Sequence, residues 1–301
     1  MYLGGIEAGG KFFVCAIGDS KGKILAKERM VTREPRETVE QVITFFKNFK
    51  IAALGIGSFG PIDLNEGSAT YGSITSTPKL AWADYPLLKM IRAALDVPIG
   101  MTTDANVAAL GEFYEGAAKG LDGCLCVRVG SGIGAGLITN NRFLQGLTHP
   151  EMGHVLLRRH PKDTFPGTCP YHHDCLEGLA SVPAIEERWQ QPLSELVDNP
   201  IVWQIEADYL AQALMQYALI LSPKRIVIGG EVMNERNLFP LIRKRLQRLL
   251  SGYIDFAELN EQIDSYVVPP ALGENAGIIG ALIFAKQTYE RKINQPVAAT
   301  M

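Results

Sequence analysis

The chain has 301 residues, of which 47% are hydrophobic and 20% are charged, a balance that suits a globular protein with two domains and excludes a disordered one. Its formal net charge of -3 argues against a nucleic-acid-binding protein, which normally carries a basic stripe. No apolar run is long enough to span a membrane, and the N-terminus lacks the basic and apolar segments of a signal peptide. We therefore expect a cytoplasmic protein without membrane or nucleic-acid partners, in which the five cysteines form no disulfide framework.

The predicted elements alternate between strands and helices. Apolar stretches bounded by glycine and polar turns predict strands at residues 3–8, 12–17, 24–31, 51–57, 99–102, 124–129, 135–139, 225–228 and 265–268. Helical spacing of apolar residues predicts helices at residues 35–49, 86–95, 105–119, 179–189, 201–221, 238–250 and 276–290. This alternation is typical of an α/β protein.

The chain shows signs of two related halves. A hairpin near the N-terminus is joined through Gly9-Gly10, and the same plan restarts at Gly123 with a hairpin joined through a second glycine-rich turn. We predict an N-terminal domain at 1–118 and a C-terminal domain at 119–301. The last helix, at about 276–301, could pack back on the N-terminal domain.

Four glycine-rich segments are candidate ligand-binding turns. Gly9-Gly10 and the segment 130–136 let successive backbone N–H groups converge on a phosphate, although plain hairpin turns would read the same way. Neither is a dinucleotide fingerprint or a P-loop. Gly229-Gly230 could seat a nucleoside or be an ordinary strand-to-helix turn. The small residues of 273–280 would let a helix N-terminus approach a ligand or the sheet closely.

Histidine and cysteine are concentrated in one short region. Two cysteines and two histidines at short spacing match a four-coordinate structural zinc site, whose ligands would be His154, Cys169, His172 and Cys175, with His173 left over. A metal would order the loop 162–168, which has little apolar content of its own. A coincidental grouping is the alternative, and iron or cobalt would bind the same donors.

Three carboxylates are candidate functional groups. Asp104 follows a predicted strand and precedes a helix, a position in which an N-cap is the commoner role and a general base in a cleft the other. Glu151 and Glu177 flank the histidine and cysteine region. They could accept hydrogen bonds from sugar hydroxyls or be solvated charges.

Taken together, these motifs resemble the ROK family (repressors, open reading frames and kinases), and within it the bacterial fructokinases. The family signature is matched from Val129 to His154. Further similar segments are GGIEAGG (4–10), GIGSFGPID (55–63), YGSITSTPKLAW (71–82), HPEMGH (149–154) and CPYHHDCLEGLAS (169–181). The last of these has the C-P-x-H-x-x-C spacing of fructokinases in place of the C-x-C-G-x-x-G-C that most of the family has.

The resemblance implies an actin-like, ribonuclease H-like ATPase fold, with two related domains and a cleft that binds a hexose and MgATP. It implies phosphorylation of D-fructose to fructose 6-phosphate, with Asp104 as the general base. Glu151, His154 and Glu177 would bind the sugar, and His154 would also bind the structural Zn²⁺. The residues implied in ATP binding are Gly9, Gly10, Lys11, Ser131, Gly132, Gly229, Gly230, Gly273, Asn275 and Gly277. Relatives are commonly homodimers.

Lys79 stands where glucose-specific relatives have asparagine, which favours fructose. Other positions depart from the family pattern in segments that the resemblance assigns to ATP binding or to the zinc loop, and those on the ATP side would weaken nucleotide binding. The first phosphate turn of the family is usually GGTK, whereas this chain has Gly9-Gly10-Lys11-Phe12, so the hydroxyl is missing and the lysine comes one position earlier. Val182, Glu231 and His173 each replace a usual glycine, which would cost stability if the backbone there needs a positive φ.

Three other functions stay open. One is a kinase for mannose or glucose, and another is a sugar-binding relative that has lost phosphoryl transfer. The third is a sugar-responsive repressor, which would carry a helix-turn-helix ahead of the sugar domain. We expect no such segment here, because the first predicted strand begins next to the N-terminus.

Overall fold

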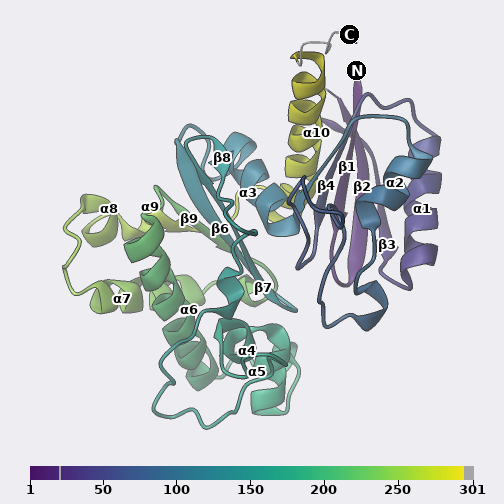
Figure 1. Ribbon diagram of the computed structural model, residues 1–301. Helices are drawn as coiled ribbons and strands as arrows, with labels where there is room; N and C mark the ends of the chain where they lie inside the picture. The colour runs from purple at the N-terminus through teal and green to yellow at the C-terminus, as the bar shows by residue number, and fades with distance from the viewer. Residues whose placement is uncertain (20–21, 295–301) are drawn as a thin grey trace. The chain divides into compact units, whose positions relative to one another are not determined.

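A computed structural model describes residues 1–19 and 22–294 (Figure 1). The chain forms two compact units. The first comprises Met1–Tyr114, Gln145–His149 and the chain from Glu274 on, and the second comprises Glu115–Leu144 and Pro150–Gly273. The domain boundary expected at 118 and 119 stays a prediction. The expected last helix reaches 301, and its final residues, 295–301, lie outside the described residues.

The first unit is built on a mixed sheet with the order β3-β2-β1-β4-β5. Its strands are β1 (Tyr2–Ala8), β2 (Phe12–Asp19), β3 (Ile24–Val31), β4 (Leu54–Ser58) and β5 (Ile99–Thr103). β1, β2 and β3 form an antiparallel meander, and β4 and β5 run parallel to β1. Its helices are α1 (Pro35–Lys47), α2 (Leu87–Ala94), α3 (Asp104–Glu115) and α10 (Ala276–Asn294).

Helices cover both faces of this sheet, with α10 on one side and α1 and α2 on the other (Figure 1). Glycines in the strands let α10 approach closely, since a Cβ on Gly55 would lie 2.1 Å from the carbonyl oxygen of Ala281. On the other side, Phe45 and Phe46 of α1 belong to the buried core of the unit. The sheet therefore lies between two helical layers.

The second unit repeats the strand order of the first. Its sheet has the order β10-β9-β6-β7-β8, with β6, β7 and β8 antiparallel and β9 and β10 parallel to β6. The strands are β6 (Gly123–Val129), β7 (Ile133–Thr139), β8 (Arg142–Phe143), β9 (Ile226–Gly229) and β10 (Val267–Val268). The helices are α4 (Leu176–Ala180), α5 (Val182–Trp189), α6 (Pro200–Leu221), α7 (Leu238–Leu250), α8 (Ala257–Asn260) and α9 (Ile263–Tyr266). The expected α/β architecture with two related halves is confirmed.

Besides shifts of a few residues at the ends of other elements, two predicted elements differ from the structure. The helix expected at 179–189 is divided by Ser181, whose Oγ accepts a hydrogen bond from the Ala184 amide at 3.4 Å and so starts a second helix. The strand expected at 265–268 is only two residues long, because Ile263–Tyr266 forms a helical turn. Within the described residues, no helix combines the length and the hydropathy needed to cross a bilayer.

Glu206, on α6, is a buried carboxyl group without a hydrogen-bond partner. Its residue is 1% exposed, and neither side-chain oxygen has a partner in the part of the chain that the structure describes. Burial raises the pKa of Glu206 well above its usual value, and the charge of Arg188 opposes the shift without cancelling it. The folded protein therefore holds Glu206 neutral at pH values where the unfolded chain has released this proton.

This difference predicts that Glu206 costs stability as the pH rises. Its stabilising contribution is fully present below the unfolded pKa of about 4.5 and is lost as the pH rises through the higher folded pKa. In this range the free energy of unfolding of Glu206→Gln minus that of the wild type should increase by up to about 1.4 kcal/mol per pH unit. Urea unfolding from pH 5 to pH 8 measures this difference. The exposed Glu187→Gln, on α5, is the control, and a difference that does not change with pH would contradict the account.

Candidate active site

Asp104 is the first residue of α3, directly after β5. The capping role is taken by its neighbour, because the Thr103 hydroxyl accepts the Asn106 amide at 3.1 Å. Asp104 Oδ1 accepts the amide of Ala105 at 2.8 Å, and its carboxylate is half-buried. Asp104 is therefore held at a strand-to-helix junction without being needed as the main cap, and its second oxygen accepts no hydrogen bond from the part of the chain that the structure describes.

The first glycine turn, between β1 and β2, is pinned by two hydrogen bonds. The Gly9 amide donates to the carbonyl of Phe12 at 2.9 Å, and the Thr32 hydroxyl donates to the carbonyl of Gly9 at 2.8 Å. Lys11 is exposed at the tip of this turn. No sequence pattern predicts the hydrogen bond from Thr32, because this residue directly follows β3 and is far from Gly9 along the chain.

Asn275 and Gly277, at the start of α10, belong to the first unit, whereas Gly273 belongs to the second; we expected the nucleoside site in the C-terminal domain. Asn275 Oδ1 accepts a 2.6 Å hydrogen bond from Lys27 Nζ of β3. A Cβ on Gly277 would lie 2.3–2.5 Å from the carboxylate atoms of Glu7, so only glycine lets α10 begin against this buried strand residue. Gly273 has a φ of 55°, which also favours glycine.

The second glycine turn, between β6 and β7, is in contact with a predicted sugar residue. Glu177 Oε2, from α4, accepts the Ile133 amide at 2.8 Å, and a Cβ on Gly132 would lie 2.8 Å from the same oxygen. The Val182 amide donates to the carbonyl of Gly130 at 2.8 Å. Val182 is the first residue of α5 and its φ is not positive, so the replacement of a usual glycine carries no backbone strain. Ser131 is exposed at the tip of the turn.

Gly229 ends β9, and Gly230 follows it. Gly230 has a φ of 103°, and a Cβ there would lie 2.3 Å from the carbonyl oxygen of Val129, so glycine is required. Glu231 has helical angles, with φ -59° and ψ -42°, which every residue adopts readily. The substitution at Glu231 therefore needs no compensation.

The four predicted metal ligands come together in the second unit. One donor atom from each of His154, Cys169, His172 and Cys175 lies within 4.8 Å of the others. His154 Nδ1 is 3.4 Å from Cys175 Sγ and 3.7 Å from Cys169 Sγ, and His172 Nδ1 is 3.7 Å from Cys169 Sγ. A tetrahedral zinc ion bound by sulfur and nitrogen requires about 3.6 Å between such atoms. The cluster therefore fits a metal ion.

Two further observations concern residues in and beside the cluster. Burial raises the pKa of the Cys175 thiol to about 12, so this cysteine is no ready nucleophile. His173, the spare histidine, is exposed and has a φ of 55°, the conformation that explains why glycine is usual there. Its ring is not part of the cluster.

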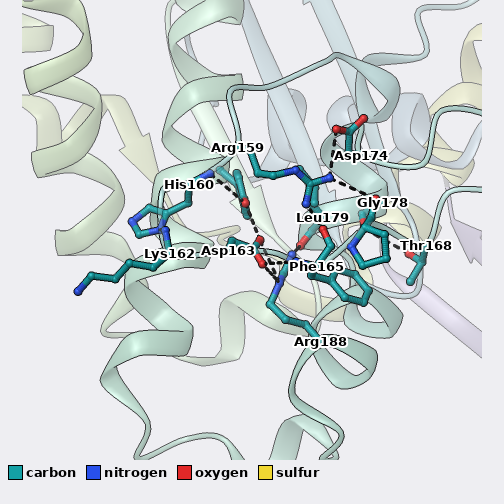
Figure 2. Close-up of polar contacts among 12 residues, drawn as sticks. Arg159, His160, Lys162, Asp163, Phe165, Thr168, Asp174, Gly178, Leu179 and Arg188 are labelled. Carbon is teal, nitrogen blue, oxygen red and sulfur yellow. Dashed lines mark hydrogen bonds and ion pairs between the residues drawn. The ribbon is translucent and has the colours of Figure 1, made fainter.

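The loop between His154 and Cys169 has polar support of its own (Figure 2). Asp163 is buried and pairs with the equally buried Arg188 of α5 at 3.2 Å. The Tyr209 hydroxyl of α6 donates to Asp163 Oδ2 at 2.5 Å. Arg159 reaches the carbonyl of Phe165, and its Nη2 lies 3.2 Å from Asp174 Oδ2. We expected a metal to order this loop, and a buried ion pair additionally holds its middle.

The remaining sugar candidate, Glu151, is exposed and directly precedes a short 3₁₀ turn that carries His154. The described structure thus distributes the predicted residues over both units. Asp104, the first glycine turn and the start of α10 lie in the first unit. The second glycine turn, the residues Glu151, His154 and Glu177, the metal cluster and Gly229-Gly230 lie in the second.

Comparison with known proteins gives a consistent result. Residues 3–288 match the model of the ROK family. A protein of Bacillus subtilis (strain 168) with a provisional fructokinase name is 52% identical, over 96% of both chains. The fructokinase of Pediococcus pentosaceus is 42% identical, over 95% of this chain and 98% of its own.

The fold is also found among solved structures. The ROK hexokinase of Thermus thermophilus superposes with a TM-score of 0.77 at 24% identity, over 97% of this chain and 100% of its own. The fold is thus the two-domain, actin-like ATPase fold that the sequence motifs implied. The chain belongs to the ROK family.

Proposed function

We propose that this protein transfers the γ-phosphoryl group of ATP to D-fructose and releases fructose 6-phosphate and ADP. The observation that carries the proposal is the nearly full-length similarity to relatives named as fructokinases, which spans both units at 42–52% identity. The placement of Asp104 at the end of β5 supports it chemically. The activity is that of a hexose kinase.

In the proposed reaction Asp104 is the general base. A fructose hydroxyl attacks the γ-phosphorus, the bond from this phosphorus to the bridging oxygen of ADP breaks, and the hydroxyl proton passes to the Asp104 carboxylate. The amides of the two glycine turns would hold the phosphates, because no Cβ blocks their approach at Gly10 or Gly132. Mg²⁺ bound with ATP would neutralise phosphate charge.

In the proposed sugar site, the carboxylates of Glu151 and Glu177 accept hydrogen bonds from sugar hydroxyls. The imidazole of His154 forms a hydrogen bond with a further hydroxyl. The cluster geometry supports a shared role for His154, since its Nδ1 lies close to both cysteines and its Nε2 makes no hydrogen bond within the described residues. Zn²⁺ is the ion we propose for the cluster, where it would fix the orientation of this imidazole. Gly229, Gly230, Gly273, Asn275 and Gly277 would surround the nucleoside.

Product analysis tests the choice of sugar and of hydroxyl. We expect zinc-loaded protein with MgATP to convert fructose in preference to mannose or glucose by at least about 10-fold in kcat/KM, a margin that a few polar contacts supply. The product should be consumed by glucose-6-phosphate isomerase, which requires the phosphate on the 6-hydroxyl. Preference for mannose or glucose would make the enzyme a kinase for that hexose. A homodimer, a cytoplasmic location and the absence of nucleic-acid and membrane partners stay predictions.

A further inference from the structure

Lys79 lies against the first glycine turn. A Cβ built on Gly10 would be 2.9 Å from Lys79 Cε and 3.9 Å from Lys79 Nζ. The end of this exposed side chain therefore lies beside the turn that the proposed function assigns to phosphate.

The backbone of Lys79 is held in place by hydrogen bonds within its own loop. The Lys79 amide donates to the hydroxyl of Thr77 at 3.3 Å, and the Lys79 carbonyl accepts the amide of Trp82 at 2.8 Å. Trp82 is 2% exposed, and its indole nitrogen donates to the carbonyl of Arg33 at 2.9 Å. The turn that carries Lys79 is therefore anchored in the core of the first unit, while its long side chain extends to Gly10.

The ammonium group of Lys79 has no ion-pair or hydrogen-bond partner within residues 1–19 and 22–294. It borders an open cavity of about 470 Å³, in which the other cation, Arg33, is already paired with Glu37 at 2.6 Å. An accessible cation without a partner, on an anchored turn and next to the backbone amides of a glycine turn, is suited to bind an anion.

We propose that Lys79 is a catalytic residue that binds the γ-phosphoryl group of ATP and neutralises its charge during transfer. The inference rests on the proposed phosphoryl transfer. Lys79 would supply the cation that the altered Gly9-Gly10-Lys11 turn lacks at its usual position. Its effect is electrostatic, because a cation held close to the transferred group stabilises the charge that develops on its oxygens.

Lys79→Met keeps the aliphatic stem and removes the charge. We expect this variant to bind MgATP roughly 10- to 100-fold more weakly, as for a lost hydrogen bond to a charged group, and to bind MgADP as the wild type does. Its kcat should fall by about 10²- to 10³-fold. Fructose affinity without nucleotide should stay within a few-fold of the wild-type value, a result that distinguishes this role from the fructose preference that the family resemblance attached to Lys79. Lys89→Met, at an exposed position on α2, is the matched control and should leave all four quantities unchanged.

Binding measured by calorimetry separates this inference from the proposed function. If the wild type phosphorylates no hexose but Lys79→Met still loses affinity for MgATP alone, the function is wrong, the catalytic role of Lys79 falls with it, and only its binding of the γ-phosphoryl group stands. Equal loss for MgATP and MgADP, or loss of fructose affinity alone, overturns the inference and makes Lys79 a nucleotide or sugar contact. A wild type that does not bind MgATP overturns both proposals.

Discussion

Replacement of Asp104 by asparagine should lower kcat for fructose phosphorylation by about 10²- to 10⁴-fold, the range that a positioned general base contributes. Asparagine keeps an oxygen for the Ala105 amide but accepts no proton. Because the Thr103 hydroxyl caps α3, the fold should be unaffected. Steady-state kinetics with MgATP and fructose, together with calorimetric fructose binding, measure the effect. Fructose affinity should stay within a few-fold of the wild-type value.

The matched control is Asp96→Asn, an exposed position before β5, which should behave as the wild type. Asp104→Ala should lose turnover in the same way while sugar binding remains. Loss of fructose binding or of folding in both Asp104 variants would give this carboxylate a structural role. A kcat close to that of the wild type would remove it from the mechanism.

Removal of the metal is the second change with a large expected effect. Because Glu177 follows Cys175 by two residues and holds the Ile133 amide at the second glycine turn, loss of the ion should displace both the sugar site and this turn. We expect chelation to lower kcat/KM at least about 10-fold and Zn²⁺ to restore it, in line with the effect of disturbing the surroundings of a metal site. Metal at 100 times its Kd adds about 2.7 kcal/mol to the free energy of unfolding. Removing the metal should therefore lower the midpoint temperature of unfolding by roughly 5–10 °C.

The secondary structure of the second unit should survive this treatment, because the Asp163–Arg188 pair and the Tyr209 hydroxyl hold the loop without the metal. Two neighbouring histidines provide the control. His172→Asn should reduce bound zinc, whereas His173→Asn should retain it, since asparagine tolerates the positive φ of that position. Equal zinc content in the wild type and His172→Asn would exclude His172 as a ligand.

Most of the architecture could be predicted from local sequence patterns. Glycine turns between apolar runs predicted both hairpins, and the restart at Gly123 predicted the second half. The short spacing from Cys169 to Cys175 predicted three of the ligands, because a tight loop keeps such residues close, whereas His154 reaches the cluster from across the preceding loop. The errors were local as well. Ser181, followed by Val-Pro, begins a new helix. The apolar pattern around it predicted a single helix, because the pattern continues across this serine.

Other features depend on contacts between distant parts of the chain. Nothing near Asp104 in the sequence shows that Thr103 is the better cap, because both are good capping residues. The approach of Lys79 to Gly10 joins residues that lie on separate loops, so the glycine read only as a turn. Glu206 occurs within an ordinary helical pattern, and its burial follows from the packing of the second unit.

The measurement that tests the central proposal most directly is ADP release by folded, zinc-loaded protein with MgATP, in the presence and absence of fructose. The proposed function predicts rapid release that depends on fructose and equals the amount of fructose 6-phosphate formed. It also predicts that the altered turn at Gly9-Gly10-Lys11 supports catalysis. No release above the sugar-free rate with fructose, mannose or glucose would contradict the kinase function and leave a sugar-binding protein without phosphoryl transfer.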